Sequence, residues 1–176
     1  MTKKILHITL FSLVLINTAY AQFIDIQITI EPELSATVVN DFNFGQLAAN
    51  SGEVLIELGS PSMGVFSISG FKNQRVYLDV DYPEALIHQD PLVNGKIPLT
   101  INLAANNTGE DDYRSSFPID GKNTLINIHA SSEVSPSENS QNIWEVMYVY
   151  VYGSLNIGNI PNGTYLGDIY LSVVYD

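Results

Sequence analysis

The sequence predicts an all-β fold, an immunoglobulin-like antiparallel β-sandwich of about nine or ten strands. Short runs in which apolar and polar residues alternate recur along the whole chain. This period of two is typical of half-buried strands. Gly, Pro, Asn and Asp separate the runs and act as turn signals. No stretch has the 3.6-residue apolar period of a convincing amphipathic helix.

Residues 1–21 have the layout of a secretory signal peptide. Lys3 and Lys4 form a positive start, residues 5–16 are largely apolar, and an A-x-A site ends at Ala21. The apolar run is shorter than the ~20 residues of a membrane span. A buried amino-terminal helix is the alternative. We expect cleavage after Ala21, which leaves residues 22–176 as a single domain, and we expect no transmembrane span in it.

The charge balance is strongly acidic. The whole chain has a formal net charge of −12, from 7 basic and 19 acidic residues. Removing Lys3 and Lys4 leaves 5 basic residues against the same 19 acidic ones, so the mature chain has a net charge of −14. This balance disfavours binding to nucleic acid or to anionic lipid, because both require basic patches. The chain has no cysteine, so its stability depends on packing and strand pairing.

The first strand of the mature chain is predicted over residues 22–30. Four isoleucines, Ile24, Ile26, Ile28 and Ile30, alternate with other residues and lie on one face. Pro32 ends the strand because it cannot donate a ladder hydrogen bond. A strand this apolar at the start of a domain must be covered by its own domain or by another molecule. We therefore treat residues 22–31 as an edge strand or a donor strand.

The middle of the chain contains most of the predicted strands. They span residues 34–40, 41–47, 53–58, 64–69, 75–81, 96–103, 124–130 and 143–152. Residues 84–88 are interpreted as one helical turn, and residues 104–116 and 131–142 as polar loops. Pro98 indicates an edge or bulge position. Gly153 and Ser154 are interpreted as the start of the connection to the last strand.

The strand at residues 143–152 is predicted to lie centrally in a sheet because both of its faces are apolar. One face carries four aromatic residues, Trp144, Tyr148, Tyr150 and Tyr152. Such a face suits either a packed core or a platform on which a sugar or peptide stacks. The core is the interpretation that general residue statistics favour.

The last predicted strand spans residues 163–176. Its apolar face consists of Tyr165, Gly167, Ile169, Leu171, Val173 and Tyr175. The opposite face is mixed in polarity, and a turn signal ending at Gly163 precedes the strand. Such a strand needs both a neighbouring strand and a second sheet to be stable.

We expect no catalytic site, no metal site and no cofactor. The mature chain has only His88 and His129, which without cysteine do not suggest a zinc site. No serine occupies a G-x-S-x-G motif. The acidic candidates for calcium, residues 109–112 and the Asp79/Asp81 pair, do not match the EF-hand pattern.

Both ends of the mature chain resemble pilin subunits that a chaperone and an usher assemble. Tyr175 corresponds to their penultimate aromatic residue and Gly163 to the glycine fourteen residues from the end, with the alternating face from Tyr165 to Val173 between them. The isoleucines of residues 24–30 resemble their donor strand. This chain lacks the cysteine pair that many such pilins carry.

A second resemblance spans most of the mature chain. Residues 44–47 (F-G-Q-L) and 163–167 (G-T-Y-L-G) are similar to the opening F-G-x-L and closing G-x-Y-x-G of an uncharacterised family of secreted bacterial β-sandwich domains. This family resemblance implies the fold and export but little about activity.

These resemblances imply an exported, non-enzymatic, structural or adhesive subunit at the surface, in the periplasm or in a fimbrium of a Gram-negative bacterium. Residues 22–31 would then insert into the next subunit, and residues 163–176 would contact that strand or a periplasmic chaperone. The alternative is a self-contained secreted module that binds a glycan or a protein through its loops. These two interpretations differ in whether the sandwich is complete without a strand from another chain.

Overall fold

The computed structural model describes residues 34–129 and 144–176, which all belong to the compact unit Pro32–Asp176. The predicted signal peptide, the isoleucine strand of residues 22–31 and the predicted loop of residues 131–142 lie outside the described residues.

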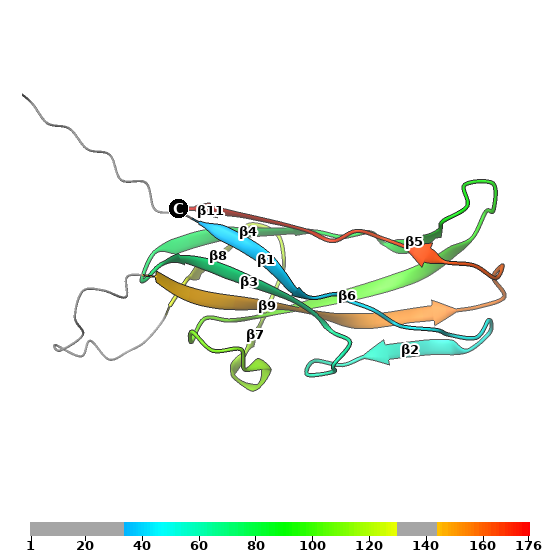
Figure 1. Ribbon diagram of the computed structural model, residues 1–176, viewed down its shortest axis with the longest axis horizontal. Coiled ribbons are helices and arrows are strands. Elements are labelled where there is room, and N and C mark those ends of the chain that lie inside the picture. Colours follow the sequence, from blue (N-terminus) through cyan, green and yellow to red (C-terminus); the bar gives the residue numbers. More distant parts are fainter. Residues whose placement is uncertain (1–33, 130–143) are drawn as a thin grey trace, which may run out of the picture. The chain divides into compact units, whose positions relative to one another are not determined.

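The described residues form an antiparallel β-sandwich, which confirms the predicted fold class (Figure 1). They contain eleven strands rather than nine or ten, and one short 3₁₀ helix. The strands are β1 (Ser35–Asn40), β2 (Gly52–Ile56), β3 (Gly64–Phe71), β4 (Arg75–Asp81), β5 (Ala85–His88), β6 (Lys96–Asn106), β7 (Phe117–Ile119), β8 (Thr124–Asn127), β9 (Trp144–Ile157), β10 (Tyr165–Leu166) and β11 (Tyr170–Tyr175). The 3₁₀ helix is η1 (Tyr113–Ser115).

The larger sheet has the strand order β1-β3-β9-β6-β5-β10. Strand β2 pairs with the second half of β9, beyond the end of β3, and β7 pairs with the second half of β6. Strand β9 therefore has neighbours on both edges for most of its length, which confirms its predicted central position. It runs through Gly153 to Ile157, so the predicted turn at Gly153 is wrong.

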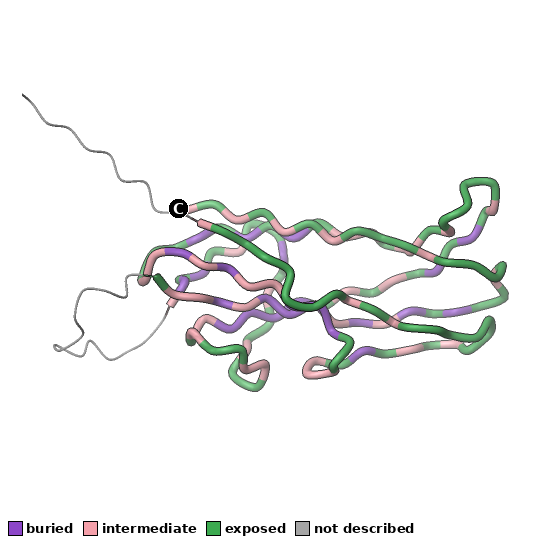
Figure 2. Tube along the Cα trace, viewed as in Figure 1, coloured by how far each residue is buried: buried purple, intermediate pink, exposed green. Residues whose placement is uncertain are grey.

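The smaller sheet has the strand order β11-β4-β8 and packs against the larger one. Strand β4 alternates strictly, with Val76, Leu78 and Val80 fully buried between exposed residues. Apolar side chains from both sheets form the core between them, and its fully buried members include Ile68, Val76, Leu78, Met147 and Val149. Figure 2 shows this buried interior between outer strands that are mostly exposed.

A second apolar cluster lies on the other face of the larger sheet. Tyr150 is fully buried there, and the half-buried Tyr148 and Tyr152 pack against the same cluster. The Tyr150 hydroxyl donates a hydrogen bond of 2.8 Å to Asp111. Burial and this bond raise the pKa of Tyr150 well above its ordinary value. The aromatic face of β9 is therefore mainly a packed core.

The loop after β6 is fixed by Asn106, which is fully buried. Its amide group donates to the carbonyl oxygens of Glu110 (3.0 Å) and Asp112 (2.7 Å), and its side-chain oxygen accepts the N–H of Thr108 (2.9 Å). Asp112 then caps η1, and hydrogen bonds from Ser115 and the Arg114 N–H lower the pKa of the Asp112 carboxyl group. The acidic loop is thus held by the protein's own groups.

Two further predictions of local structure are wrong. Residues 85–88 form strand β5 rather than a helical turn, because they pair with β6 on one edge and β10 on the other. The predicted last strand is interrupted between β10 and β11. The interruption is needed because β10 pairs with β5 of the larger sheet, whereas β11 pairs with β4 of the smaller sheet. Residues 167–169 carry the chain from one sheet to the other.

Candidate functional site: a groove between two unpaired edges

Strands β1 and β11 are both edge strands, and they run beside each other on the same side of the sandwich (Figure 1). Among the residues that the structure describes, β1 pairs only with β3 and β11 pairs only with β4. On the opposite side of the sandwich, residues 120–123 connect β7 of the larger sheet to β8 of the smaller one. There the Gly121 carbonyl oxygen accepts a 2.6 Å hydrogen bond from Val80. The described part of the chain thus covers one side of the sandwich and leaves the β1/β11 side open.

The free edge of β11 presents unpaired backbone groups. Val80 in β4 donates its N–H toward Gly121, away from β11, so its partner Leu171 is not hydrogen-bonded to β4. The Asp176 N–H, five residues further on, donates to the Arg75 carbonyl oxygen of β4. By alternation, the N–H and C=O groups of Leu171, Val173 and Tyr175 point away from β4, toward the open side.

The free edge of β1 follows the same rule. The Phe71 N–H donates to the Tyr175 hydroxyl and therefore points away from β9. Ser69 and Ser67 lie two and four residues earlier in β3, so their backbone groups point to the same side as that of Phe71 and pair with β1. Their partners are Ser35 and Thr37, which leaves the backbone groups of Ala36 and Val38 on the free edge. Within residues 34–129 and 144–176, two rows of backbone donors and acceptors without a strand partner therefore border the open side.

Neither edge has the features that usually prevent a sheet edge from pairing. Strands β1 and β11 are six residues long and contain no charged residue and no proline. The other edges in the described part of the chain differ. Strand β2 carries Glu53, β7 has three residues and contains Pro118, β8 has four residues and β10 has two. Natural sheets protect their edges with charges, proline and short strands. The long edges of β1 and β11 lack this protection.

The side chains that face inward along the two edges are incompletely covered. All residues of β1 are exposed, and Val38 keeps 60% of its surface accessible although it lies beside the inward-facing Phe66 (Figure 2). In β11, Leu171, Val173 and Tyr175 are half-buried, whereas the inward residues of β4 beside them are fully buried. The core is therefore unfinished along this side.

Two adjoining cavities lie along the open side. The smaller, 380 Å³, lies between β1 and the start of β11, and apolar side chains such as Val38, Phe66 and Ile169 line it. The larger, 760 Å³, continues toward β10 and has a more polar rim, which includes Asn43, Gln46, Asn162 and Thr164. Both are lined by Asp41, Phe42, Phe44, Leu86 and Gly167. We call the two cavities together the β1/β11 groove.

Tyr175 joins the two sheets at the end of β11, outside the residues that line the two cavities. Its hydroxyl accepts a 3.0 Å hydrogen bond from the Phe71 N–H, which connects the smaller sheet to the larger one. Gly70 lies between Leu34 and Tyr175, and a Cβ atom there would be 3.0 Å from each of their side chains. The nearest side chain to such an atom is that of Ile128, so the absence of a side chain at Gly70 lets Ile128, Leu34 and Tyr175 pack directly on the β3 backbone.

Of the predicted residues of the last strand, Gly163 and Tyr165 line the larger cavity and Ile169 lines the smaller one, whereas Leu171, Val173 and Tyr175 lie further along β11, outside both linings. Tyr165, Ile169, Leu171, Val173 and Tyr175 are all half-buried, and the residues between them are exposed. Gly163 lies against His88, whose ring occupies the space that a side chain at residue 163 would need. The predicted partner residues Ile24, Ile26, Ile28 and Ile30 lie outside the described residues.

The contribution of residues 41–47 to the groove was not predicted from the sequence. We predicted these residues as a strand, but they have no strand partner. Their alternation was informative in another way, because Phe42 and Phe44 are half-buried between exposed neighbours and line the groove. The sequence also did not reveal that residues 120–123, between β7 and β8, cover the side of the sandwich opposite β1 and β11.

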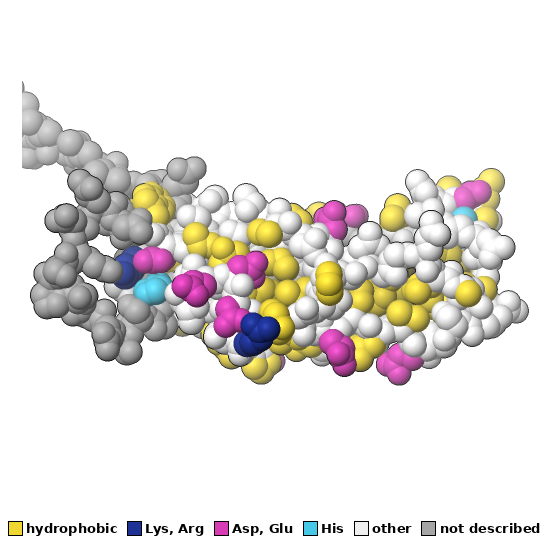
Figure 3. All heavy atoms as spheres, turned by 60° about the horizontal axis from the view of Figure 1, so that its bottom comes forward, with side chains coloured by type: hydrophobic (Ala, Val, Ile, Leu, Met, Phe, Trp, Pro, Cys, Tyr) yellow, Lys and Arg dark blue, Asp and Glu magenta, His cyan; other side chains and the backbone are white. Residues whose placement is uncertain are grey.

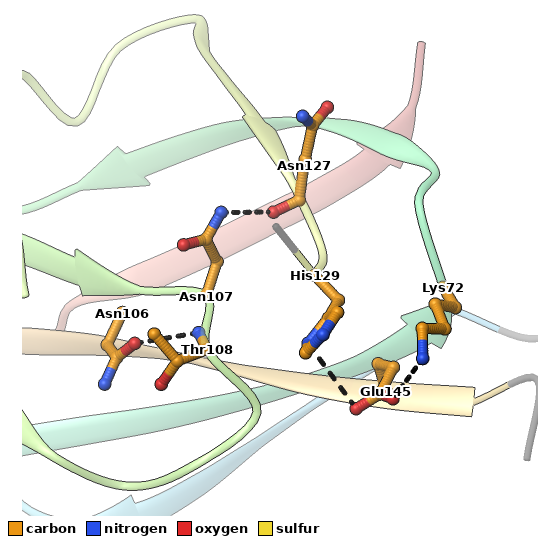
Figure 4. A network of polar contacts seen from close by, with 7 residues as sticks. All are labelled: Lys72, Asn106, Asn107, Thr108, Asn127, His129 and Glu145. Carbon is orange, nitrogen blue, oxygen red and sulfur yellow. Dashed lines mark hydrogen bonds and ion pairs between the residues drawn. The ribbon is translucent and has the colours of Figure 1, made fainter. Parts of the chain in front are cut away.

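The other residues with potential chemistry have structural partners. His129 Nδ1 lies 3.8 Å from one carboxylate oxygen of Glu145, and the Lys72 ammonium group lies 3.5 Å from the other (Figure 4). The same view shows Asn107 donating to the Asn127 carbonyl oxygen at 2.9 Å. His88 packs edge-to-face on Tyr165, away from His129 in sequence and in the fold. This set of contacts joins strands and loops rather than lining a cavity.

The acidic pair considered for calcium, Asp79 and Asp81, lies beside a basic side chain. Lys122 lies 3.7 Å from Asp79 and 3.5 Å from Asp81. Within residues 34–129 and 144–176, no three His, Asp or Glu side chains gather as they would around a metal ion. On the face shown in Figure 3, acidic side chains are spread out and basic ones do not form an extended patch.

No helix in the described ranges has the length and apolarity that crossing a membrane requires. No protein-family model matches this chain, and no curated protein is similar enough in sequence to count as a relative.

Proposed function

We propose that the protein is an exported, non-enzymatic, pilin-like structural or adhesive subunit that accepts an apolar β-strand in its β1/β11 groove. The observation that carries this proposal is the pair of unpaired, uncharged edges that border an incompletely covered core. An inserted strand would pair its backbone with these edges and place alternate side chains on the groove floor. A loop or a helix would leave the edge N–H and C=O groups unpaired.

The strand we propose is residues 22–31 of a second copy of the chain. Its four isoleucines recur every second residue, which is the spacing of the inward-facing residues of β11. Insertion into a neighbouring copy is a head-to-tail contact, and such contacts generate filaments when they do not close into a ring. Before assembly, a periplasmic chaperone would cover the same groove. The proposed place of action is the periplasm, cell surface or fimbrium of a Gram-negative bacterium.

Size-exclusion chromatography with light scattering tests this proposal on the mature chain, residues 22–176, and on residues 32–176. We expect concentration-dependent oligomers from the first chain and a monomer from the second. The shortened chain should bind a peptide of residues 22–31 added in trans. A mature chain that stays monomeric, and that unfolds when residues 22–31 are removed, would instead be a self-contained sandwich whose loops are tested for glycan or protein ligands.

A pair of matched double variants separates the isoleucine face from the rest of the segment. Ile26→Asp with Ile28→Asp should abolish assembly, because two carboxylates cannot be buried on an apolar floor without partners. Gln27→Asp with Thr29→Asp adds the same charges to the opposite face of the same strand and should assemble normally. Equal assembly by both double variants would rule out insertion of this face.

A further inference from the structure

Residues 41–47 follow β1 along the groove and are weakly held. The Asn40 side chain fixes the end of β1 by donating to the carbonyl oxygens of Pro61 (3.0 Å) and Met63 (2.6 Å). Beyond it, the Asn43 N–H donates to the Ser62 carbonyl oxygen (3.2 Å), and the Gly45 N–H donates to the Asn43 side chain (2.8 Å). A segment with so few backbone hydrogen bonds is easier to move than a strand within a sheet.

Two aromatic rings of this segment stand in the groove. The rings of Phe42 and Phe44 meet edge to face, with their centroids 4.9 Å apart. Both rings are half-buried, and both line the 380 Å³ cavity and the 760 Å³ cavity. The pair therefore stands where the two cavities adjoin.

The two rings differ in how firmly they are held. Phe42 packs closely on Gly64, where a Cβ atom would lie 3.1 Å from the Phe42 Cβ atom, and it also contacts the central core cluster around Val151. Phe44 shares with Phe42 the contact with the cluster around Tyr150 and also packs against the cluster at the far end of the groove, but no glycine of β3 lies under it and it precedes Gly45. Gly45 has a φ of 70°, a backbone conformation that favours glycine, and the space around it is open. Phe44 is thus the more movable ring.

This inference rests on the function proposed above. We propose that Phe44 is a removable plug of the strand-binding groove. While the groove is empty, the Phe44 ring covers part of the apolar floor, and an inserting strand displaces the ring and takes its place. The plug lowers the apolar surface that an unassembled subunit exposes, and it makes displacement of the ring a step in strand insertion.

The test compares Phe44→Ala with Phe117→Ala in the full mature chain. Phe117 is a matched control because it is a partly exposed phenylalanine (39% accessible) in β7, outside the residues that line the groove. Light scattering after dilution from denaturant-free monomer measures the initial rate of assembly. We expect Phe44→Ala to assemble about fivefold faster than the wild type, which corresponds to losing half of the burial of a phenylalanine ring. Phe117→Ala should match the wild type.

A second measurement tests whether the Phe44 ring covers apolar surface of the groove, and it does not depend on assembly. Binding of the dye anilinonaphthalene sulfonate reports exposed apolar surface, and it should increase for Phe44→Ala but not for Phe117→Ala. Circular dichroism at the assay temperature confirms that each variant is folded. Unchanged or slower assembly of Phe44→Ala, or dye binding equal to that of the control, overturns the proposal that Phe44 is a removable plug. Failure of every chain to assemble overturns the proposed function, and the dye measurement still decides whether Phe44 covers the groove.

Discussion

The Tyr175 hydroxyl provides a direct test of how the two sheets are joined at the end of β11. Tyr175→Phe removes only the oxygen that accepts the Phe71 N–H at 3.0 Å. The N–H is partly buried and has no replacement partner, so we expect a loss of about 1 to 1.5 kcal/mol in the free energy of unfolding. For a chain of this size, this loss corresponds to a decrease of roughly 2–6 °C in melting temperature.

Tyr175→Ser extends the same test to the ring. The ring is half-buried against the core between the sheets. Half of the ~1.5–3 kcal/mol for burying a large apolar side chain is lost with it. Together with the hydrogen bond, the expected total is about 2 to 3 kcal/mol.

Urea denaturation followed by circular dichroism measures these losses, with Tyr170→Phe as the control. Tyr170 lies in the same strand, is 62% exposed, and reaches Asp168 only at 3.4 Å. Its variant should stay within about 0.5 kcal/mol of the wild type. A Tyr175→Phe chain as stable as the wild type, or equal losses in the two Tyr→Phe variants, would refute our account of how Tyr175 joins the two sheets.

Three further changes test the interior. Because burial and Asp111 raise the pKa of Tyr150, the native state keeps a proton that the unfolded state loses above about pH 10, so stability should fall by about 1.4 kcal/mol per pH unit there. Urea titrations at several alkaline pH values should show this slope reduced in Tyr150→Phe, and an unchanged slope would contradict it. Asn106→Ala should cost about 2–4 kcal/mol because three hydrogen bonds of a fully buried amide are lost, whereas Asn107→Ala, on a more exposed residue, should cost under about 1 kcal/mol. Gly153→Ala should prevent stable folding because its Cβ atom would overlap the Thr100 carbonyl oxygen, and soluble yield measures this against Gly158→Ala, which has open space.

The alternation of side chains allowed much of the fold to be predicted. Strand β4 spans the residues we predicted, because its period of two is uninterrupted and each apolar residue is buried. Strand β9 was placed centrally because both of its faces are apolar. These features depend on which side chains are buried, and the pattern of apolar residues in the sequence indicates this directly.

The failures share a different cause. Residues 85–88 are too few to distinguish one helical turn from a strand, and only pairing with β6 and β10 decides between them. Residues 165–175 keep their alternation while the chain passes from one sheet to the other, so the pattern did not reveal the break. Gly153 resembles a turn residue in sequence but is required by the close approach of Thr100. Contacts between residues distant in sequence decide all three cases.

The groove itself was predicted only in part. The face from Tyr165 to Tyr175 was identified from its sequence, and the structure shows this face at an open edge. The opposite wall, formed by β1 and residues 41–47, depends on which strands remain unpaired. Edge positions are a property of the sheet order, which alternation within a single strand does not contain.

The position of β9 in the chain has a consequence for the time at which the protein folds. Strands β2, β3 and β6 all pair with β9, whose residues 144–157 come after about four-fifths of the sequence. The larger sheet therefore cannot assemble while only the earlier residues have been synthesised. Pairing over such long sequence separations makes folding slow. The earlier strands must therefore remain without their central partner during most of synthesis.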